Sequence, residues 1–171
     1  MMSNGMGKVS VNDWVERVFR SGQVCGDYMR KWQAAQTKAE RFRVIADTNS
    51  GEWLIALDAK GVALPVDDFC NEYRNFINGA QVVEYPQGYT STFYCQYFAG
   101  IDADTTLVHV FHCDLAIRVP ANTFPRIILS RDSMVRINVE KGARLAVEDY
   151  GARELEIRGD TSNVKITKHY E

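Results

Sequence analysis

Long uncharged apolar runs are missing from this sequence of 171 residues. Because a helix needs roughly 18 to 20 such residues to cross a bilayer, the sequence predicts no transmembrane helix. The N-terminus has no basic start followed by an apolar run, so the usual secretory pattern is missing and residues 1–9 are expected to form a disordered leader. We therefore expect a cytoplasmic protein with no membrane partner.

Cysteines are few. The chain has four, Cys25, Cys70, Cys95 and Cys113, and no two of them form a CxxC motif. This spacing fits neither a zinc knuckle nor a redox motif. We expect reduced, mostly packed thiols, and one or two structural disulfides are the alternative.

Neither sign of charge is in large excess. The 20 Lys and Arg residues face 22 Asp and Glu residues, which leaves a formal net charge of -2, and 46% of the residues are hydrophobic. This composition is typical of a globular protein. It excludes a disordered tail, a collagen-like repeat and a highly basic nucleic-acid coat.

Motifs of the common enzyme classes are missing too. No GxSxG, GxGxxG or GxxxxGK[ST] occurs, which excludes the usual nucleophile elbow and nucleotide-binding folds. His109, His112 and Cys113 lie close together in the sequence, but alternation along a strand places the two histidines on opposite faces. A packed His109 is therefore expected, with a bulge that unites the histidines around a metal as the alternative. Asp102 and Asp104 resemble part of a calcium loop that lacks its other ligands.

The first part of the chain has helical spacing. Ser10 or Asn12 is expected to cap a first helix, and Thr37 with Glu40 forms a capping-box pattern that opens a later one. Five short helices are predicted between Gly, Pro and Ser stops. Residues 10–80 are therefore expected to form a helical domain.

From about residue 81 the spacing changes to the alternation typical of strands. Apolar-alternating segments recur with an average spacing near ten and a paired period near twenty, starting at Leu107, Leu115, Ile127, Val135, Leu145, Leu155 and Val164. A paired period favours a short β-solenoid, in which coils of two strands stack in parallel. An antiparallel β-sandwich is the alternative, because alternation does not distinguish parallel stacking from hairpins. The sequence thus predicts an α+β protein whose residues 81–171 form a β-rich repeat domain.

Stacking at this period also predicts which side chains share a face. The inward residues are expected to be Ile117, Val119, Val135, Ile137, Val139, Leu145, Val147, Leu155, Ile157, Val164 and Ile166. On the outer face Arg136 is expected to lie beside Glu156 as an opposite-charge pair.

Two sets of residues are candidate contact surfaces. The tyrosines of the segment that bridges the two halves form a candidate protein interface, with burial between the halves as the alternative: Tyr85, Tyr89, Tyr94 and Tyr97. Between residues 14 and 43, seven basic and three acidic residues leave a local net charge of +4. Four of these basic residues are candidate nucleic-acid contacts: Arg30, Lys31, Lys38 and Arg41.

Because no catalytic residues, cofactor or metal site is predicted, the expected function is a non-enzymatic structural or protein-interaction module that self-associates. A short solenoid has two open coil ends, and the strand around Val164 leaves one of them available for a second copy or a protein partner. The alternative is a nucleic-acid-binding accessory protein that uses the basic helices of residues 14–43.

Three short segments carry a resemblance to known proteins. Phe76-Ile-Asn-Gly, Gly88-Tyr-Thr-Ser and Ala103-Asp-Thr-Thr, followed by the β-repeats, resemble uncharacterised proteins of gut bacteria and of their mobile elements or prophages. The resemblance spans most of the chain. It implies a bacterial, cytoplasmic context and no activity or binding residues.

Overall fold

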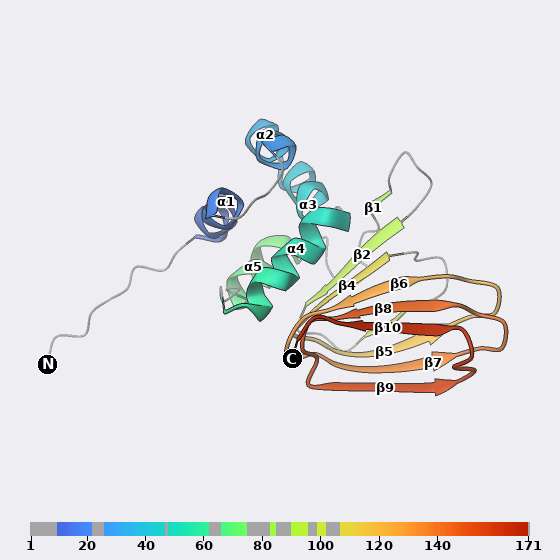
Figure 1. Cartoon of the computed structure of the whole chain (residues 1–171). Helices are drawn as coiled ribbons and strands as arrows, with labels where there is room; N and C mark the ends of the chain where they lie inside the picture. Colours follow the sequence, from blue (N-terminus) through green and yellow to red (C-terminus); the bar gives the residue numbers. More distant parts are fainter. Residues whose placement is uncertain are drawn as a thin grey trace, which may run out of the picture.

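In the computed structural model, the described residues form five helices followed by ten strands in two sheets (Figure 1). The structure describes residues 10–21, 26–46, 48–61, 66–74, 83–84, 90–95, 99–101 and 107–170, without the side chains of residues 21, 48–50, 66 and 83–101. The helices are α1 (Val11–Ser21), α2 (Gly26–Ala34), α3 (Lys38–Ala46), α4 (Thr48–Ala59) and α5 (Val66–Tyr73). The predicted leader lies outside the described residues.

Side-chain caps explain where two of the helices begin. The Asp13 backbone N–H donates to Ser10 Oγ at 3.1 Å, so Ser10 caps α1. At α3 the Glu40 N–H donates to Thr37 Oγ1 at 3.2 Å, and the Thr37 N–H donates to Glu40 Oε2 at 3.0 Å. These reciprocal bonds form the predicted capping box.

The strands build a β-solenoid, as the paired period predicts. They are β1 (Val83–Glu84), β2 (Thr90–Cys95), β3 (Ala99–Ile101), β4 (Leu107–Phe111), β5 (Asp114–Val119), β6 (Arg126–Leu129), β7 (Met134–Val139), β8 (Leu145–Asp149), β9 (Glu154–Gly159) and β10 (Val164–Lys168). The six-stranded sheet has the order β1-β2-β4-β6-β8-β10, and the four-stranded sheet has the order β3-β5-β7-β9. Apart from the antiparallel pair of β1 and β2, all these neighbours are parallel. Parallel pairing excludes the antiparallel sandwich.

From β2 onward, consecutive strands alternate between the two sheets, so each complete coil contributes one strand to each sheet. Leu115 aligns with Val135 and Val135 with Leu155, in steps of one coil. The coils β4–β5, β6–β7 and β8–β9 follow one another, and β10 begins the next. The pairing of β2 with β4 and of β3 with β5 starts the two sheets before Leu107, earlier than the repeat in the sequence indicates.

The corners between the strands require positive φ angles at equivalent positions. His112 (45°), Asp132 (61°) and Gly151 (108°) turn the chain from the six-stranded to the four-stranded sheet, and Asn122 (61°) and Gly142 (85°) return it. Glycine adopts this left-handed region freely, and Asn, Asp and His tolerate it better than most side chains. A corner residue at each such turn therefore keeps the coil length close to twenty.

Two apolar cores hold the fold together. One lies inside the solenoid and contains predicted inward residues such as Ile117, Val135 and Leu145. The other lies between the helices and the outer face of the six-stranded sheet, where Phe111 and Ile128 pack among the helical aromatics. The helices therefore cover one sheet of the solenoid.

Burial of the predicted inward residues declines toward the C-terminal end. Leu155, Ile157 and Val164 are only partly buried, and Ile166 is 44% exposed. Ile166 has the predicted inward position, since it aligns with the core residue Val147 of β8, but it stays exposed because no further coil among the described residues stacks on β10. The predicted neighbours Arg136 and Glu156 do align across β7 and β9.

The turn at His112 places Cys113 on a different side of the sheet from the one that strand alternation predicts. His109 and Phe111 face the helices as one set, but Cys113 packs inside the solenoid. Strict alternation places Cys113 with His109, which is wrong because the corner residue His112, with its φ of 45°, interrupts the strand.

The described cysteines are in two states. Cys113 is a buried thiol in the reduced state. Cys70 is disulfide-bonded, and its partner lies outside the described side chains. The expectation of a reduced thiol is therefore wrong for Cys70, and the structural disulfide weighed as the alternative is present.

Gly51 lets α4 approach the sheet closely. A Cβ at this position would lie 2.5 Å from Nε2 of the buried His109 ring. We expect Gly51→Ala to destabilise the fold by about 1 to 3 kcal/mol, an overpacking cost larger than the gain in helix propensity. Urea denaturation measures the change. In a His109→Ala background the same substitution should become neutral or stabilising, and an equal loss in both backgrounds would contradict the contact.

Candidate functional site

Charged residues line the contact between α4 and the outer face of the six-stranded sheet. Glu52 and Asp58 come from α4, and their direct partners come from β6 and the corners. Glu148 of β8 and His169 of the C-terminal tail extend the set. We call this set the polar seam: Glu52, Asp58, His112, Arg126, Arg131, Glu148, Tyr150 and His169. It brings together titratable side chains that are far apart in the sequence.

The first group of the polar seam surrounds Asp58, whose side chain is fully buried. Arg131 donates to both carboxylate oxygens, from Nε to Oδ2 and from Nη2 to Oδ1, each at 3.2 Å. His112 Nε2 lies 2.7 Å from Asp58 Oδ2. Because an ionised carboxylate can only accept, this ring nitrogen carries the proton. The negative charge of Asp58 is thus compensated by a bidentate ion pair and a hydrogen bond.

The second group surrounds Glu52. Arg126 Nη2 donates to Glu52 Oε2 at 2.7 Å and lies 3.6 Å from Glu148 Oε1. The Tyr150 hydroxyl donates to Glu52 Oε1 at 2.8 Å. Tyr150 also stacks on the His169 ring, with centroids 4.2 Å apart and an interplanar angle of 7°. This group joins α4 to β6, β8 and the C-terminal tail.

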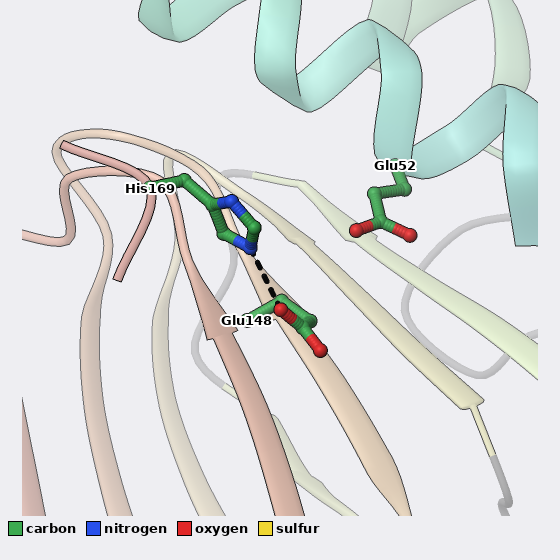
Figure 2. A group of neighbouring side chains, drawn as sticks. All are labelled: Glu52, Glu148 and His169. Atoms are coloured by element: carbon green, nitrogen blue, oxygen red, sulfur yellow. Dashed lines mark hydrogen bonds and ion pairs between the residues drawn. The ribbon is translucent and has the colours of Figure 1, made fainter. Parts of the chain in front are cut away.

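Figure 2 shows Glu52, Glu148 and His169, which meet at the end of this group. One ligand atom from each lies within 4.8 Å of the others, a geometry that suits a metal ion. However, the Arg126 guanidinium bonds Glu52 and lies close to Glu148, so it already supplies the positive charge. His169 Nε2 donates to Glu148 at 2.7 Å and is not available as a lone-pair ligand in that state. The arrangement favours an ion-pair network over a cation site.

The hydroxyl of Tyr150 should titrate late. Burial, followed by its hydrogen bond to Glu52, raises the pKa of Tyr150 above its ordinary value. The folded state therefore favours the neutral phenol, and this contribution is complete below the unfolded pKa of about 10 and is lost as the pH rises through the folded value. We expect Tyr150→Phe to show a smaller fall in the free energy of unfolding between about pH 9 and about pH 11 than the unmodified chain. An identical fall in both proteins would contradict the assignment.

The sequence contains one usable signal for the polar seam. Asp58 follows Leu54 by four residues, so it lies on the buried face of α4, where an acidic residue needs a partner. Nothing in the local sequence marks Arg131 or His112 as that partner. His109 and His112 are not united around a common site: His109 packs on Gly51, and His112 binds Asp58.

The four basic candidates for nucleic-acid contact all have local interactions. Arg30 forms an ion pair with Asp27, and Lys38 forms one with Glu72 at 3.0 Å. Lys31 Nζ lies 5.1 Å from the Tyr28 ring centroid, and the Arg41 guanidinium lies 5.6 Å from that of Trp32. The structure therefore places these residues on α2 and α3 with their charge partly engaged by their own neighbours.

Most of the candidate interface tyrosines lie outside the residues that the structure describes. Tyr85, Tyr89 and Tyr97 lie outside the described residues. Tyr94 is part of β2, where it aligns with Val110 of β4, and its side chain is not described. Their role as an interface stays a prediction.

The C-terminal coil end is the second candidate site. Within the part of the chain that the structure describes, no strand pairs with the outer edge of β9 or of β10. We define the coil end by its apolar residues Leu155, Ile157, Val164 and Ile166, which are partly buried or exposed. Unpaired backbone groups beside exposed apolar side chains are a template for adding another strand.

The helices of the described ranges are all too short or too polar to cross a membrane. Comparison of the chain with family models, with curated proteins and with solved structures gives no match.

Proposed function

We propose that this chain is a non-enzymatic structural module that acts through protein contacts, mainly self-association, at its C-terminal coil end. The observation that carries the proposal is that no described strand pairs with the outer edges of β9 and β10, beside an Ile166 that is 44% exposed. Completing such an edge buries apolar surface and satisfies backbone donors and acceptors together.

The polar seam supports a structural role in a different way. Asp58 is bound by Arg131 and His112, and Glu52 by Arg126 and Tyr150, so these side chains satisfy one another. A catalytic group needs access to a substrate, whereas the Asp58 carboxylate is fully buried under its partners. These interactions attach the helices to the solenoid and leave the coil end as the contact surface.

Replacing Ile166 by Glu tests the proposal. A charge at the exposed end of the apolar row should abolish self-association, while the fold is retained because Ile166 is not a core residue. Analytical ultracentrifugation over a wide concentration range measures the association, and circular dichroism checks the fold.

Phe124→Glu is the matched control, because Phe124 is 64% exposed and lies in the corner between β5 and β6, away from the coil end. It should associate like the unmodified chain. An unmodified chain that stays monomeric, or an Ile166→Glu variant that associates as well as the control, would refute self-association at this end.

Nucleic-acid binding through α2 and α3 is the alternative function. Binding to single-stranded or duplex DNA at low salt that collapses between about 50 and 200 mM salt would support it, because phosphate contacts release counterions. Loss of that binding in an Arg30→Ala, Lys31→Ala variant would assign it to α2.

A bacterial, cytoplasmic setting belongs to the proposal as well, but the disulfide at Cys70 weighs against it. The cytosol keeps most thiols reduced, whereas disulfides persist in oxidising compartments. Mass spectrometry of protein alkylated during cell lysis decides the matter. An alkylated Cys70 would support the cytoplasmic setting, and an oxidised Cys70 would refute it.

A further inference from the structure

The C-terminal end of the solenoid is stepped. β8 and β9 belong to the same coil, and β10 adds one more strand to the six-stranded sheet only. Beyond β9, therefore, the four-stranded sheet has an empty strand position among the described residues. β10 stands beside that position on the opposite sheet, and in Figure 1 it lies close to β8 while β9 forms the outer edge.

We propose that two copies join end to end so that β10 of each copy pairs antiparallel with β9 of the other. The two-fold axis of this crossed dimer runs parallel to the strands. Such a rotation carries the six-stranded sheet of one copy onto the four-stranded sheet of the other, and because consecutive strands of a coil run in opposite directions, the new pairs are antiparallel. This inference rests on the proposed self-association and specifies which strands pair and which two-fold axis relates the two copies.

The difference of one strand between the ends of the two sheets distinguishes the crossed dimer from the alternative, a direct dimer. In a direct dimer, with the axis perpendicular to the sheets, β10 would pair with β10 and β9 would face β9. Because each four-stranded sheet ends one strand earlier, the β9 edges would then stay apart, with two unfilled strand positions between them. In the crossed dimer each β10 fills the position above a β9, so both edges of both copies are paired.

The side chains favour the crossed dimer as well. Antiparallel pairing that keeps apolar residues inward sets Val164 against Ile157 of the second copy, and Ile166 against Leu155 of the second copy. In this register Lys165 lies directly opposite Glu156 of the second copy. Lys165 is exposed and Glu156 lies on the outer face of β9, so the pair joins opposite charges across the new ladder.

The direct dimer opposes like charges instead. When Val164 is set against Ile166 of the second copy, Lys165 faces the Lys165 of that copy. Like charges directly opposite one another destabilise a strand pair.

The residues after β10 leave its outer edge open. The His169 backbone N–H donates to the Asp149 carbonyl at 2.8 Å, and the Tyr170 hydroxyl donates to Asp149 Oδ2 at 3.0 Å. His169 also binds Glu148 through its ring. The tail therefore stays against β8 and its corner.

Charge reversal tests the predicted pair. Lys165→Glu should weaken the dimer about tenfold, since each dimer contains two copies of the Lys165–Glu156 pair. Mixing Lys165→Glu copies with Glu156→Lys copies should restore the affinity, because both pairs of the mixed dimer then join opposite charges. Lys60→Glu, which makes the same charge change at an exposed site after α4, should leave the affinity unchanged.

Cross-linking of full-length chains separates the two dimers. Copies carrying Lys165→Cys should form a disulfide with copies carrying Glu156→Cys but not with one another, and the unmodified chain is the blank for the native cysteines. A disulfide between two Lys165→Cys copies would overturn the crossed dimer while self-association stands. A chain that sediments as a monomer at every concentration would overturn both.

Discussion

Replacing Phe111 by Ala is expected to lower the free energy of unfolding by about 3 to 5 kcal/mol, the range measured for buried Phe→Ala changes. Phe111 is fully buried at the end of β4, and its ring stacks on Phe69 of α5 with centroids 5.9 Å apart. It belongs to the core that joins the helices to the outer face of the six-stranded sheet. Its loss leaves a cavity at that junction, and urea denaturation followed by circular dichroism and Trp fluorescence measures the cost.

Phe124→Ala removes the same atoms from an exposed site and is the matched control. Phe124 is 64% exposed, so its truncation should change the stability by no more than about 0.5 kcal/mol. Because all three tryptophans lie in the first 53 residues, Trp fluorescence reports on the helices and far-ultraviolet circular dichroism on both parts. Equal, small effects of the two substitutions would contradict a shared core at Phe111.

Replacing Asp58 by Ala is expected to cost about 2 to 4 kcal/mol, somewhat less than a fully buried ion pair because its partners are partly hydrated. The side chain of Asp58 is completely inaccessible, whereas that of Arg131 is 37% exposed and that of His112 is 18% exposed. Without the carboxylate, three N–H donors, two from Arg131 and one from His112, and a positive charge remain in a partly buried site. Thermal and urea unfolding at neutral pH measure the loss.

Asp132→Ala is the control for this prediction. Asp132 Oδ2 lies 3.9 Å from His112 Nδ1, but its side chain is 66% exposed, so water screens the interaction. Asp132 also holds a positive φ of 61°, and Asp132→Asn, which suits that angle, separates the charge from the backbone effect. If Asp58→Ala cost no more than Asp132→Asn, the ion pair with Arg131 would contribute nothing to the attachment of α4.

Together, Phe111→Ala and Asp58→Ala measure how strongly the helices are attached to the solenoid. Phe111 probes the apolar part of the contact, and Asp58 probes the charged part. Phe111 lies on β4 and Asp58 on α4, whereas the coil end is formed by β9 and β10. Neither change should therefore weaken self-association as long as the variant is folded. Stability and association are therefore predicted to respond to different residues.

Much of the solenoid could be predicted from the sequence because its determinants are local. Alternation within Val135-Arg-Ile137 and within Leu155-Glu-Ile157 marks strands, and a period near twenty aligns them as the structure has them. Corner residues such as Asp132 and Gly142 can also be recognised in the sequence, because Asp and Gly are typical turn residues. The paired period favoured parallel stacking, and the strand pairing of the structure decided it against the antiparallel alternative.

The polar seam could not be predicted in the same way. Asp58 and His112 are 54 residues apart, and Glu52 and Tyr150 are 98 apart. Each of these residues has the local spacing of an ordinary helix or corner residue. The sidedness of Cys113 was also predicted wrongly, since one corner residue resets the alternation on which the prediction depended.

The sequence by itself determined that helices precede a β-repeat with a paired period near twenty, because helix caps, turn residues and apolar periods act over a few residues. Only the tertiary structure decided which sheet the helices cover and which charges meet there, because such contacts depend on how whole elements pack. The stepped coil end belongs to the second kind. Its strands are visible in the sequence, but the difference of one strand between the two sheets follows only from their assembly into coils.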